Sequence, residues 1–150
     1  MANYSPNVNT RGLIFADNRG VLLRSSYYVY QIYQSCMGGY SVVNDVICSN
    51  IKDANALALD AASIKMSDKK FYLFVVNRDS EADILSNIEI AGFNVKKSSC
   101  VILTADNLRS YNDFDHPNSV ILKNLDSDIR GEKFEFDFPK HSITALTFEK

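Results

Sequence analysis

The sequence predicts a mainly β fold, an antiparallel β-sandwich preceded by a short β/α segment. After Gly39 the chain is a series of short apolar runs separated by polar turns, a spacing typical of a sandwich. Near its end, Phe134, Phe136 and Phe138 alternate with acidic residues, the period of two expected of a strand with one solvated face. A chain of 150 residues is long enough for one domain with a hydrophobic core.

The first part of the chain, residues 1–38, has a different pattern. Apolar runs at 13–15 and 21–23 flank a turn-like segment at 17–20. Apolar side chains then recur at helical spacing from 27 to 37, which predicts a helix capped by Ser25 and Ser26 and ended by Gly38 and Gly39. The tyrosine and β-branched content leaves a strand as the alternative. The predicted apolar face of the helix contains Tyr28, Val29, Ile32, Tyr33 and Cys36.

The second part, residues 39–150, is predicted to hold eight short strands. Residues 71–76 are apolar throughout, so that strand should be covered on both faces. Residues 66–70 and 77–80 are predicted turns. The expected strands cover residues 41–48, 56–64, 70–77, 82–90, 98–104, 119–122, 133–138 and 142–148.

Composition excludes several classes of protein. A net charge of −2 with scattered basic residues makes nucleic acid an unexpected partner. No apolar window approaches the roughly 20 residues that cross a bilayer, and residues 1–10 have no apolar signal core, so we expect a cytoplasmic protein. Cys36, Cys48 and Cys100 are odd in number and widely spaced, and we expect them to be free thiols.

The sequence offers no strong candidate for a catalytic, cofactor-binding or metal-binding residue. Residues 126–131 resemble the start of a calcium loop, but Arg130 stands where an oxygen ligand is required, so a surface turn is expected. His116 and His141 are interpreted as loop-organising residues rather than catalytic bases. Acidic residues two apart would share a face and be solvated, which disfavours a catalytic role for Asp113 and Asp115, Asp126 and Asp128, or Glu135 and Asp137.

Four stretches of the chain, in order, resemble the end of family 51 α-L-arabinofuranosidases. The segment around residues 9–30 is similar to the last strand and helix of the family's barrel. Residues 75–78 resemble its Val-Asn-Arg strand end, residues 105–118 its Tyr-Asn-Asp-Phe-acid-X-Pro loop, and residues 139–146 its closing Pro-X-His-Ser strand. The Tyr-Asn-Asp-Phe loop is the most specific of the four.

The resemblance implies a jelly-roll sandwich at residues 39–150, preceded at 1–38 by the remnant of a (β/α)₈ barrel. In the family, the acid/base and nucleophilic glutamates lie on the fourth and seventh barrel strands. Both would precede Met1, so the chain alone is expected to be inactive. Some relatives place an arabinose-contacting glutamine at the position of Ser25, and serine is too short to reproduce that contact.

The function implied is a non-catalytic accessory domain of an α-L-arabinofuranosidase. Its expected partners are the catalytic barrel, a second copy of the chain and, through the parent enzyme, arabinose-containing poly- or oligosaccharides. The alternatives are a stand-alone carbohydrate-binding module and an interaction module that completes a separately encoded barrel. The absence of tryptophan weakens the carbohydrate-binding alternative. Without a barrel, the helix should pack on the sandwich or on another copy.

Overall fold

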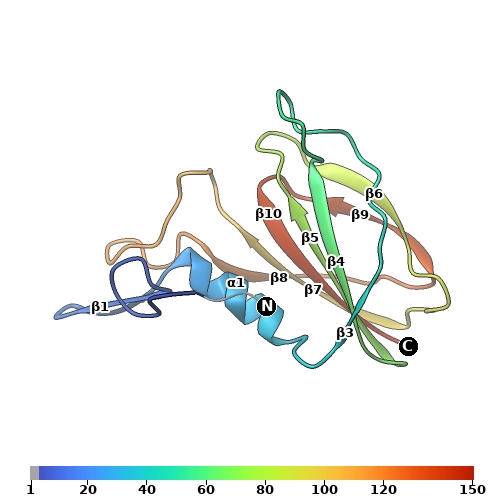
Figure 1. Ribbon diagram of the computed structural model, residues 1–150, viewed down its shortest axis with the longest axis horizontal. Coiled ribbons are helices and arrows are strands. Elements are labelled where there is room, and N and C mark those ends of the chain that lie inside the picture. Colours follow the sequence, from blue (N-terminus) through green and yellow to red (C-terminus); the bar gives the residue numbers. More distant parts are fainter. Residues whose placement is uncertain (1–3) are drawn as a thin grey trace.

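A computed structural model describes residues 4–150 and confirms a mainly β fold built from antiparallel sheets (Figure 1). The described part of the chain contains one helix, α1 (Ser25–Gln34). Its strands are β1 (Ile14–Asp17), β2 (Gly20–Leu23), β3 (Tyr40–Val42), β4 (Leu59–Ser67), β5 (Lys70–Asn77), β6 (Ile84–Glu89), β7 (Lys97–Thr104), β8 (Ile121–Leu125), β9 (Lys133–Phe138) and β10 (Ser142–Glu149).

The strands form three sheets. The main sheet has six strands in the order β3-β4-β5-β10-β7-β8. β6 pairs with β9, and β1 pairs with β2 in a separate hairpin. The last strand, β10, lies between β5 and β7, so the C-terminal segment holds the two halves of the main sheet together.

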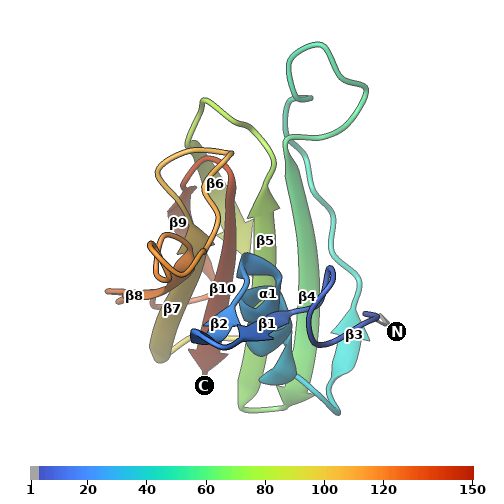
Figure 2. The same cartoon turned by 90° about the vertical axis from the view of Figure 1, so that its left-hand side faces the viewer.

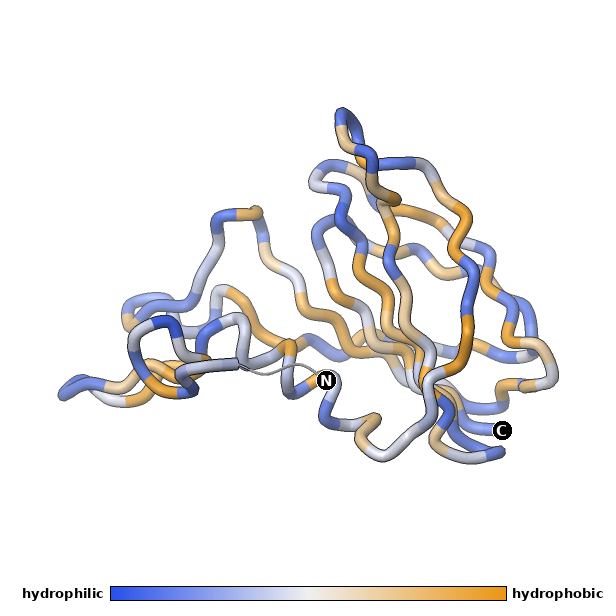
Figure 3. Tube along the Cα trace, viewed as in Figure 1, coloured by the Kyte–Doolittle hydropathy of each residue, from blue (hydrophilic) through white to orange (hydrophobic). Residues whose placement is uncertain are grey.

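The main core lies between the six-stranded sheet and the β6–β9 pair. β5 supplies Phe71, Leu73 and Val75 to it, and Phe138 of β9 packs opposite, 1% exposed. The even-numbered side chains of β5 point to the other face, where a second apolar cluster forms. β5 is therefore covered on both faces, as predicted, and the hydropathy pattern along the chain follows this arrangement (Figure 3).

The helix α1 lies across the outer face of the six-stranded sheet (Figure 2). Ile32 is 5% exposed, and the Tyr33 ring centroid lies 4.6 Å from that of Phe74. All five residues of the predicted apolar face belong to this second cluster. Of the two packing partners expected for the helix, the sandwich is the one that the structure shows, so the face no longer argues for self-association.

The boundaries of the helix differ from the prediction. It begins at Ser25 and ends at Gln34, and the N-cap is Arg24, whose side chain makes no capping hydrogen bond. The predicted serine cap is therefore wrong. Arg24 still has extended backbone angles, φ −77° and ψ 160°, so the turn into the helix occurs one residue earlier than the serines suggested.

Several strand boundaries also differ. The strand predicted at 41–48 ends at Val42, and the residues after it run as an extended segment without a ladder partner. The strand predicted at 56–64 begins at Leu59 and continues to Ser67, so the turn predicted at 66–70 is confined to residues 68 and 69. β8 begins at Ile121 and ends at Leu125, two to three residues later than predicted.

Two sequence-based expectations about the chain's chemistry can be placed on the fold. Cys100 is buried in the main core, whereas Cys36 and Cys48 are half-buried in different clusters, and all three are free thiols. Among the described residues, no helix is long and apolar enough to span a membrane.

Candidate functional site

An open cleft of about 560 Å³ lies between the β1–β2 hairpin, the start of α1 and the loop that joins β7 to β8. The hairpin and this loop project together from one end of the sandwich (Figure 1). The cleft is lined by residues from all three segments, including Phe15, Arg19, Arg24, Ser25, Tyr111 and Phe114.

Two phenylalanines and two arginines form the floor of the cleft. The rings of Phe15 and Phe114 meet edge to face, with centroids 5.8 Å apart. The Arg19 guanidinium lies 4.2 Å from the Phe114 centroid, and that of Arg24 lies 5.3 Å from the Phe15 centroid. These are cation–π distances. Each guanidinium therefore occupies one ring face that a sugar could otherwise use for stacking.

The hairpin turn is organised by an ion pair. Arg19 Nη2 lies 2.8 Å from Asp17 Oδ2, and the Arg19 backbone N–H also donates to Asp17 Oδ1. The side-chain hydrogen bond from Arg19 lowers the pKa of Asp17 and raises that of the Arg19 guanidinium. Both groups are solvated, so the pair orients the arginine over Phe114 more than it stabilises the fold.

Asn112 fastens the hairpin to the sandwich. Its side chain is buried, and Nδ2 donates to the carbonyl oxygens of Leu23, at 3.0 Å, and Val120, at 2.8 Å. Its Oδ1 accepts the Val120 N–H at 2.7 Å. One amide therefore satisfies three backbone groups and joins the end of β2 to the strand region that begins β8. The sequence indicated the surrounding loop but not this bonding role.

Asn77, in the Val-Asn-Arg stretch at the end of β5, has a similar role at the opposite end. It is 1% exposed, and its Nδ2 donates to the carbonyl oxygens of Ala82 and Phe138 at 3.0 and 2.9 Å. Its Oδ1 accepts the Asp79 N–H at 2.9 Å. The residue joins β5 to β9 across the sandwich, which accounts for a buried amide at this position.

The structure does not bring the acidic pairs together as a catalytic constellation. Of the three pairs, only Glu135 and Asp137 lie on a strand, with both side chains on the exposed face of β9. Asp113 and Asp115 line the cleft, where Asp113 Oδ1 accepts the His116 N–H at 2.6 Å. Asp126 and Asp128 are exposed in the loop before β9, and Arg130 Nε donates to Asp128 at 2.8 Å.

Both histidines organise loops. His116 is exposed, with Nδ1 3.3 Å from Asp113, in the turn that Asp113 closes. His141 stands in the turn before β10 with a φ of 38°, and its Nε2 lies 2.9 Å from the Ala105 carbonyl oxygen. Within residues 4–150 no cluster of three His, Cys, Asp or Glu side chains could hold a metal ion.

Chemically, the site is a cleft lined by aromatic rings, arginines and aspartates, with the buried Asn112 amide behind it. Sequence reasoning missed Arg19, Arg24 and Phe114 as a group, because Arg19 and Phe114 are far apart in the chain and neither has a motif of its own. Asn112 could have been singled out from its place in the Tyr-Asn-Asp-Phe loop.

Comparison with known proteins places these features in a family. The model of the alpha-L-arabinofuranosidase C-terminal domain matches residues 1–142. The chain is similar to an intracellular exo-alpha-L-arabinofuranosidase from Bacteroides ovatus, at 27% identity over 124 residues. That match covers 80% of this chain but only 24% of the relative.

Solved structures agree in fold. The chain superimposes on a thermostable GH51 alpha-L-arabinofuranosidase from Thermotoga petrophila with a TM-score of 0.85 and 25% identity, covering 95% of this chain and 32% of that one. A GH51 arabinofuranosidase from Xanthomonas axonopodis pv. citri gives a TM-score of 0.85 at 21% identity, covering 95% of this chain and 30% of that one. The chain thus spans about a quarter to a third of the relatives it matches. With a family model that covers nearly all of its length, the chain belongs to the C-terminal domain family of the GH51 α-L-arabinofuranosidases.

Proposed function

We propose that this chain is a non-catalytic accessory part of an α-L-arabinofuranosidase, whose hydrolysis of terminal α-L-arabinofuranosyl residues takes place on a catalytic barrel. In this proposal residues 1–38 supply the end of that barrel and residues 39–150 form a sandwich packed beside it. The observation that supports the proposal is the junction between the two parts. Ile32 of α1 packs into the apolar cluster on the sandwich, and Asn112 hydrogen-bonds to Leu23 at the end of the hairpin.

The acidic side chains support a non-catalytic role. Glycosidases use two carboxyl groups that face each other across the scissile bond, roughly 5 to 9.5 Å apart. Here the acidic side chains of β9 face solvent, Asp113 accepts a backbone hydrogen bond within a turn, and Asp128 pairs with the Arg130 side chain. The cleft contains neighbouring carboxylates in Asp113 and Asp115, and these are the residues that a test of catalysis must address.

The cleft is also the one observation that favours the alternative, a module that binds carbohydrate by itself. Tyr111 is 66% exposed at its edge. Against this alternative, the rings of Phe15 and Phe114 already contact guanidinium groups and each other. Sugar-binding sites present exposed aromatic faces. We therefore propose that the partner of the cleft end of the sandwich is the barrel rather than free polysaccharide.

Two further parts of the proposal concern location and assembly. The Bacteroides ovatus protein is described as intracellular, and we propose the cytoplasm for this chain as well. We also propose that a second copy of the parent enzyme associates with it. The helix face that suggested self-association is filled by the sandwich, so such a contact would use another surface.

Activity and binding measurements on the purified chain test this proposal. We expect no turnover of 4-nitrophenyl α-L-arabinofuranoside, and no binding of arabino-oligosaccharides tighter than the millimolar range in calorimetry. Steady turnover abolished by D113N or D115N would refute the non-catalytic role. Micromolar sugar binding that is lost in Tyr111→Ala would instead support the carbohydrate-binding alternative.

A positive test uses a chimaera. Replacing the matched part of the Thermotoga petrophila enzyme with residues 1–150 of this chain should give a folded protein that retains measurable arabinofuranosidase activity. The same chimaera built with residues 39–150 alone should lose activity, because the proposed end of the barrel is then missing. Equal activity of the two chimaeras would contradict the proposed division at residue 38.

A further inference from the structure

The chain segment before β1 turns back and lies along that strand. Val8 and Ile14 form a parallel bridge. The Ile14 N–H donates to the Asn7 carbonyl oxygen at 3.0 Å, and the Asn9 N–H donates to the Ile14 carbonyl oxygen at 2.8 Å. One residue bonded to both neighbours of its partner is the pattern of a parallel ladder. Residues 7–12, which we call the masking segment, therefore take the place of a strand beside β1.

The masking segment covers the edge of β1 that faces away from β2. The Arg24 N–H donates to the Leu13 carbonyl oxygen at 2.9 Å, so the alternation of the antiparallel hairpin turns the backbone groups of Ile14 and Ala16 to the outer side. The Ala16 N–H donates to Asn9 Oδ1 at 2.8 Å. The Asn9 side chain thus continues the ladder that its backbone begins, and three outward groups of β1 have partners.

The opposite edge of the hairpin also has a partner within the chain. There the Leu23 carbonyl oxygen of β2 accepts a hydrogen bond from Asn112. An uncovered strand edge is a template for pairing with another chain. Without the masking segment, β1 would present such an edge along three consecutive apolar residues, 14–16.

The masking segment has a backbone that is costly to form. Asn9 and Thr10 have φ angles of 58° and 45°, in the left-handed region that a β-branched residue such as threonine adopts only at a cost. Gly12 permits the close return of the chain, because a Cβ atom at this position would lie 2.6 Å from the Asn7 carbonyl carbon and 2.8 Å from the Val8 nitrogen. Residues 4–11 are exposed, so the segment should open more easily than the sandwich.

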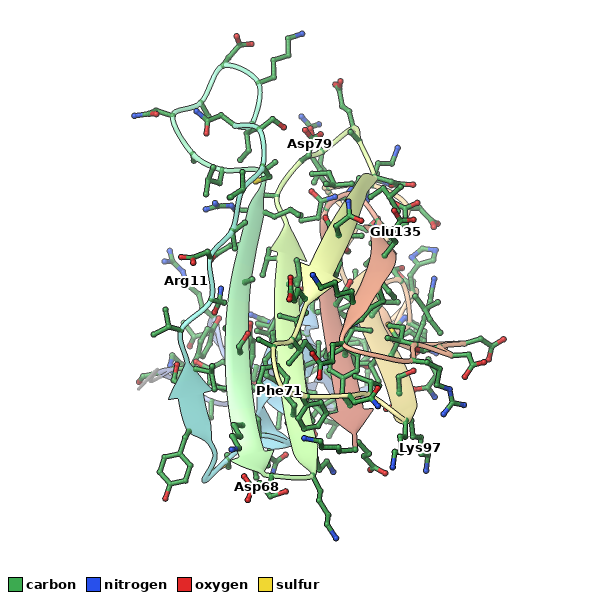
Figure 4. All side chains as sticks on the ribbon, turned by 90° about the vertical axis from the view of Figure 1, so that its right-hand side faces the viewer. Arg11, Asp68, Phe71, Asp79, Lys97 and Glu135 are labelled. Atoms are coloured by element: carbon green, nitrogen blue, oxygen red, sulfur yellow. The ribbon has the colours of Figure 1, made fainter. Side chains whose placement is uncertain are left out.

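Contacts with α1 hold the masking segment closed. Arg24, the N-cap of α1, donates from Nη1 to the Thr10 carbonyl oxygen at 2.9 Å. The Tyr4 hydroxyl donates to the Arg11 carbonyl oxygen at 2.8 Å, and the Tyr4 ring meets that of Tyr30 edge to face. Arg11 itself lies at the margin of the molecule, outside the sandwich (Figure 4). The segment is thus attached at a few points and otherwise lies in solvent.

We propose that the masking segment is an intramolecular block on the β1 edge, and that this edge pairs with the same edge of a second copy of the chain when the segment opens. A second copy fits because two identical edges are self-complementary in antiparallel pairing about a twofold axis. Ile14, Phe15 and Ala16 carry no charge that would oppose such pairing. The inference concerns the chain by itself and does not depend on the proposed function.

Amide hydrogen exchange on the 150-residue chain, followed residue by residue by NMR, tests the proposal with Gly12→Ala. The added methyl group meets backbone atoms of Asn7 and Val8, so the masking segment should open. Exchange at Ile14 and Ala16 should become at least tenfold faster in dilute protein, whereas Phe15 and Asp17, whose amides face β2, should keep their rates. Equal acceleration at all four amides would show that the segment supports the whole hairpin, and would overturn the proposal.

The effect of protein concentration tests the second half of the proposal. In G12A, exchange at Ile14 and Ala16 should slow again as the protein concentration rises, and light scattering should show a dimer. In the original chain, exchange at these two amides should not depend on concentration. Amides that stay unprotected in concentrated G12A, or the same concentration dependence in the original chain, would each overturn the proposal.

Asn9→Gly is a second variant that keeps the masking segment closed. Glycine adopts a positive φ without strain, but it removes the Oδ1 acceptor of the Ala16 N–H. Exchange should therefore become at least tenfold faster at Ala16 and stay slow at Ile14. Asn18→Ala, at an exposed asparagine of the hairpin turn, is the matched control and should alter neither amide. Unchanged exchange at Ala16 in N9G would refute the masking of this edge by Asn9. These measurements use no sugar, so their outcome is separate from the activity and sugar-binding results that test the proposed function.

Discussion

Replacing Asn112 by alanine should destabilise the protein by about 3 kcal/mol. The Asn112 side chain is 6% exposed and makes three hydrogen bonds, of 2.7, 2.8 and 3.0 Å, to backbone groups of Leu23 and Val120. A buried hydrogen bond contributes about 1 kcal/mol net, and alanine replaces none of the three. For a chain of 150 residues, this loss corresponds to a fall in Tm of roughly 6–12 °C.

Urea unfolding of the N112A variant, followed by far-UV circular dichroism, measures this loss. Asn118→Ala is the matched control, because Asn118 is an exposed asparagine in the same loop; its effect should stay within about 0.5 kcal/mol. Because one bond reaches the Leu23 carbonyl oxygen, N112A should also expose the hairpin turn at residues 17–20 to protease. A loss below about 1 kcal/mol, or equal to that of N118A, would refute the assigned role of Asn112.

Asn112→Asp separates the hydrogen-bonding account from a simple packing effect. The substitution keeps the size of the side chain and the acceptor for the Val120 N–H, but it places a second carboxylate oxygen against the two carbonyl oxygens that Nδ2 now contacts. We expect N112D to be at least as unstable as N112A at neutral pH. It should recover part of the loss in acid, where a protonated carboxyl can again donate one hydrogen bond. Stability independent of pH would contradict this account.

Three further predictions concern other parts of the fold. Ile32→Ala should lower the free energy of unfolding, measured in urea, by about 2–5 kcal/mol, because Ile32 is 5% exposed in the cluster beneath α1. Gln31 is exposed, so Gln31→Ala should have little effect. Equal effects of the two substitutions would contradict the observed packing of the helix. Burial raises the pKa of Cys100 to about 12, so the folded chain keeps that proton while the unfolded thiol loses it near pH 8.5. Stability should therefore fall as pH rises above about 8.5, and C100A should flatten that slope; an identical slope would exclude the thiol as its cause. The pKa of Asp17, lowered by the Arg19 hydrogen bond, should return toward its ordinary value in Arg19→Ala when followed by NMR, and an unmoved titration would refute the ion pair.

The bounds of two strands could be predicted from the local sequence pattern alone. β5 and β9 have the predicted bounds because an unbroken apolar run and a strict alternation each have one interpretation. Residues 41–48 contain four β-branched side chains, more than either β5 or β9, yet the strand there ends at Val42. A strand requires a neighbour for its backbone groups, and the presence of a neighbour is a property of the whole fold that local composition does not encode.

The candidate site was predictable to a smaller extent, and for the same reason. The loop containing Asn112 was indicated by its resemblance to a family motif, but its bond to Leu23 joins positions that only the folded chain brings together. The Arg19 guanidinium carbon lies 4.2 Å from the centroid of the Phe114 ring. Nothing near either residue in the sequence predicts this contact. The helix face at Ile32 was predicted from its spacing, whereas its partner on β5 required the structure.

The way in which the hairpin is held suggests how a sandwich without catalytic residues could still affect catalysis. The β1–β2 hairpin is held by the packing of α1 on the main sheet, by the hydrogen bond from Asn112 to the end of β2, and by the contacts of Phe15 and Arg19 with Phe114. If the hairpin supplies the end of the barrel, as proposed, the sandwich sets its position relative to the remaining strands. Displacements of about 1 Å among positioning groups can cost a hundredfold in rate. Under the proposed function, N112A in the active chimaera should therefore lower kcat at temperatures where the protein remains fully folded, an effect that a purely stabilising contact would not produce.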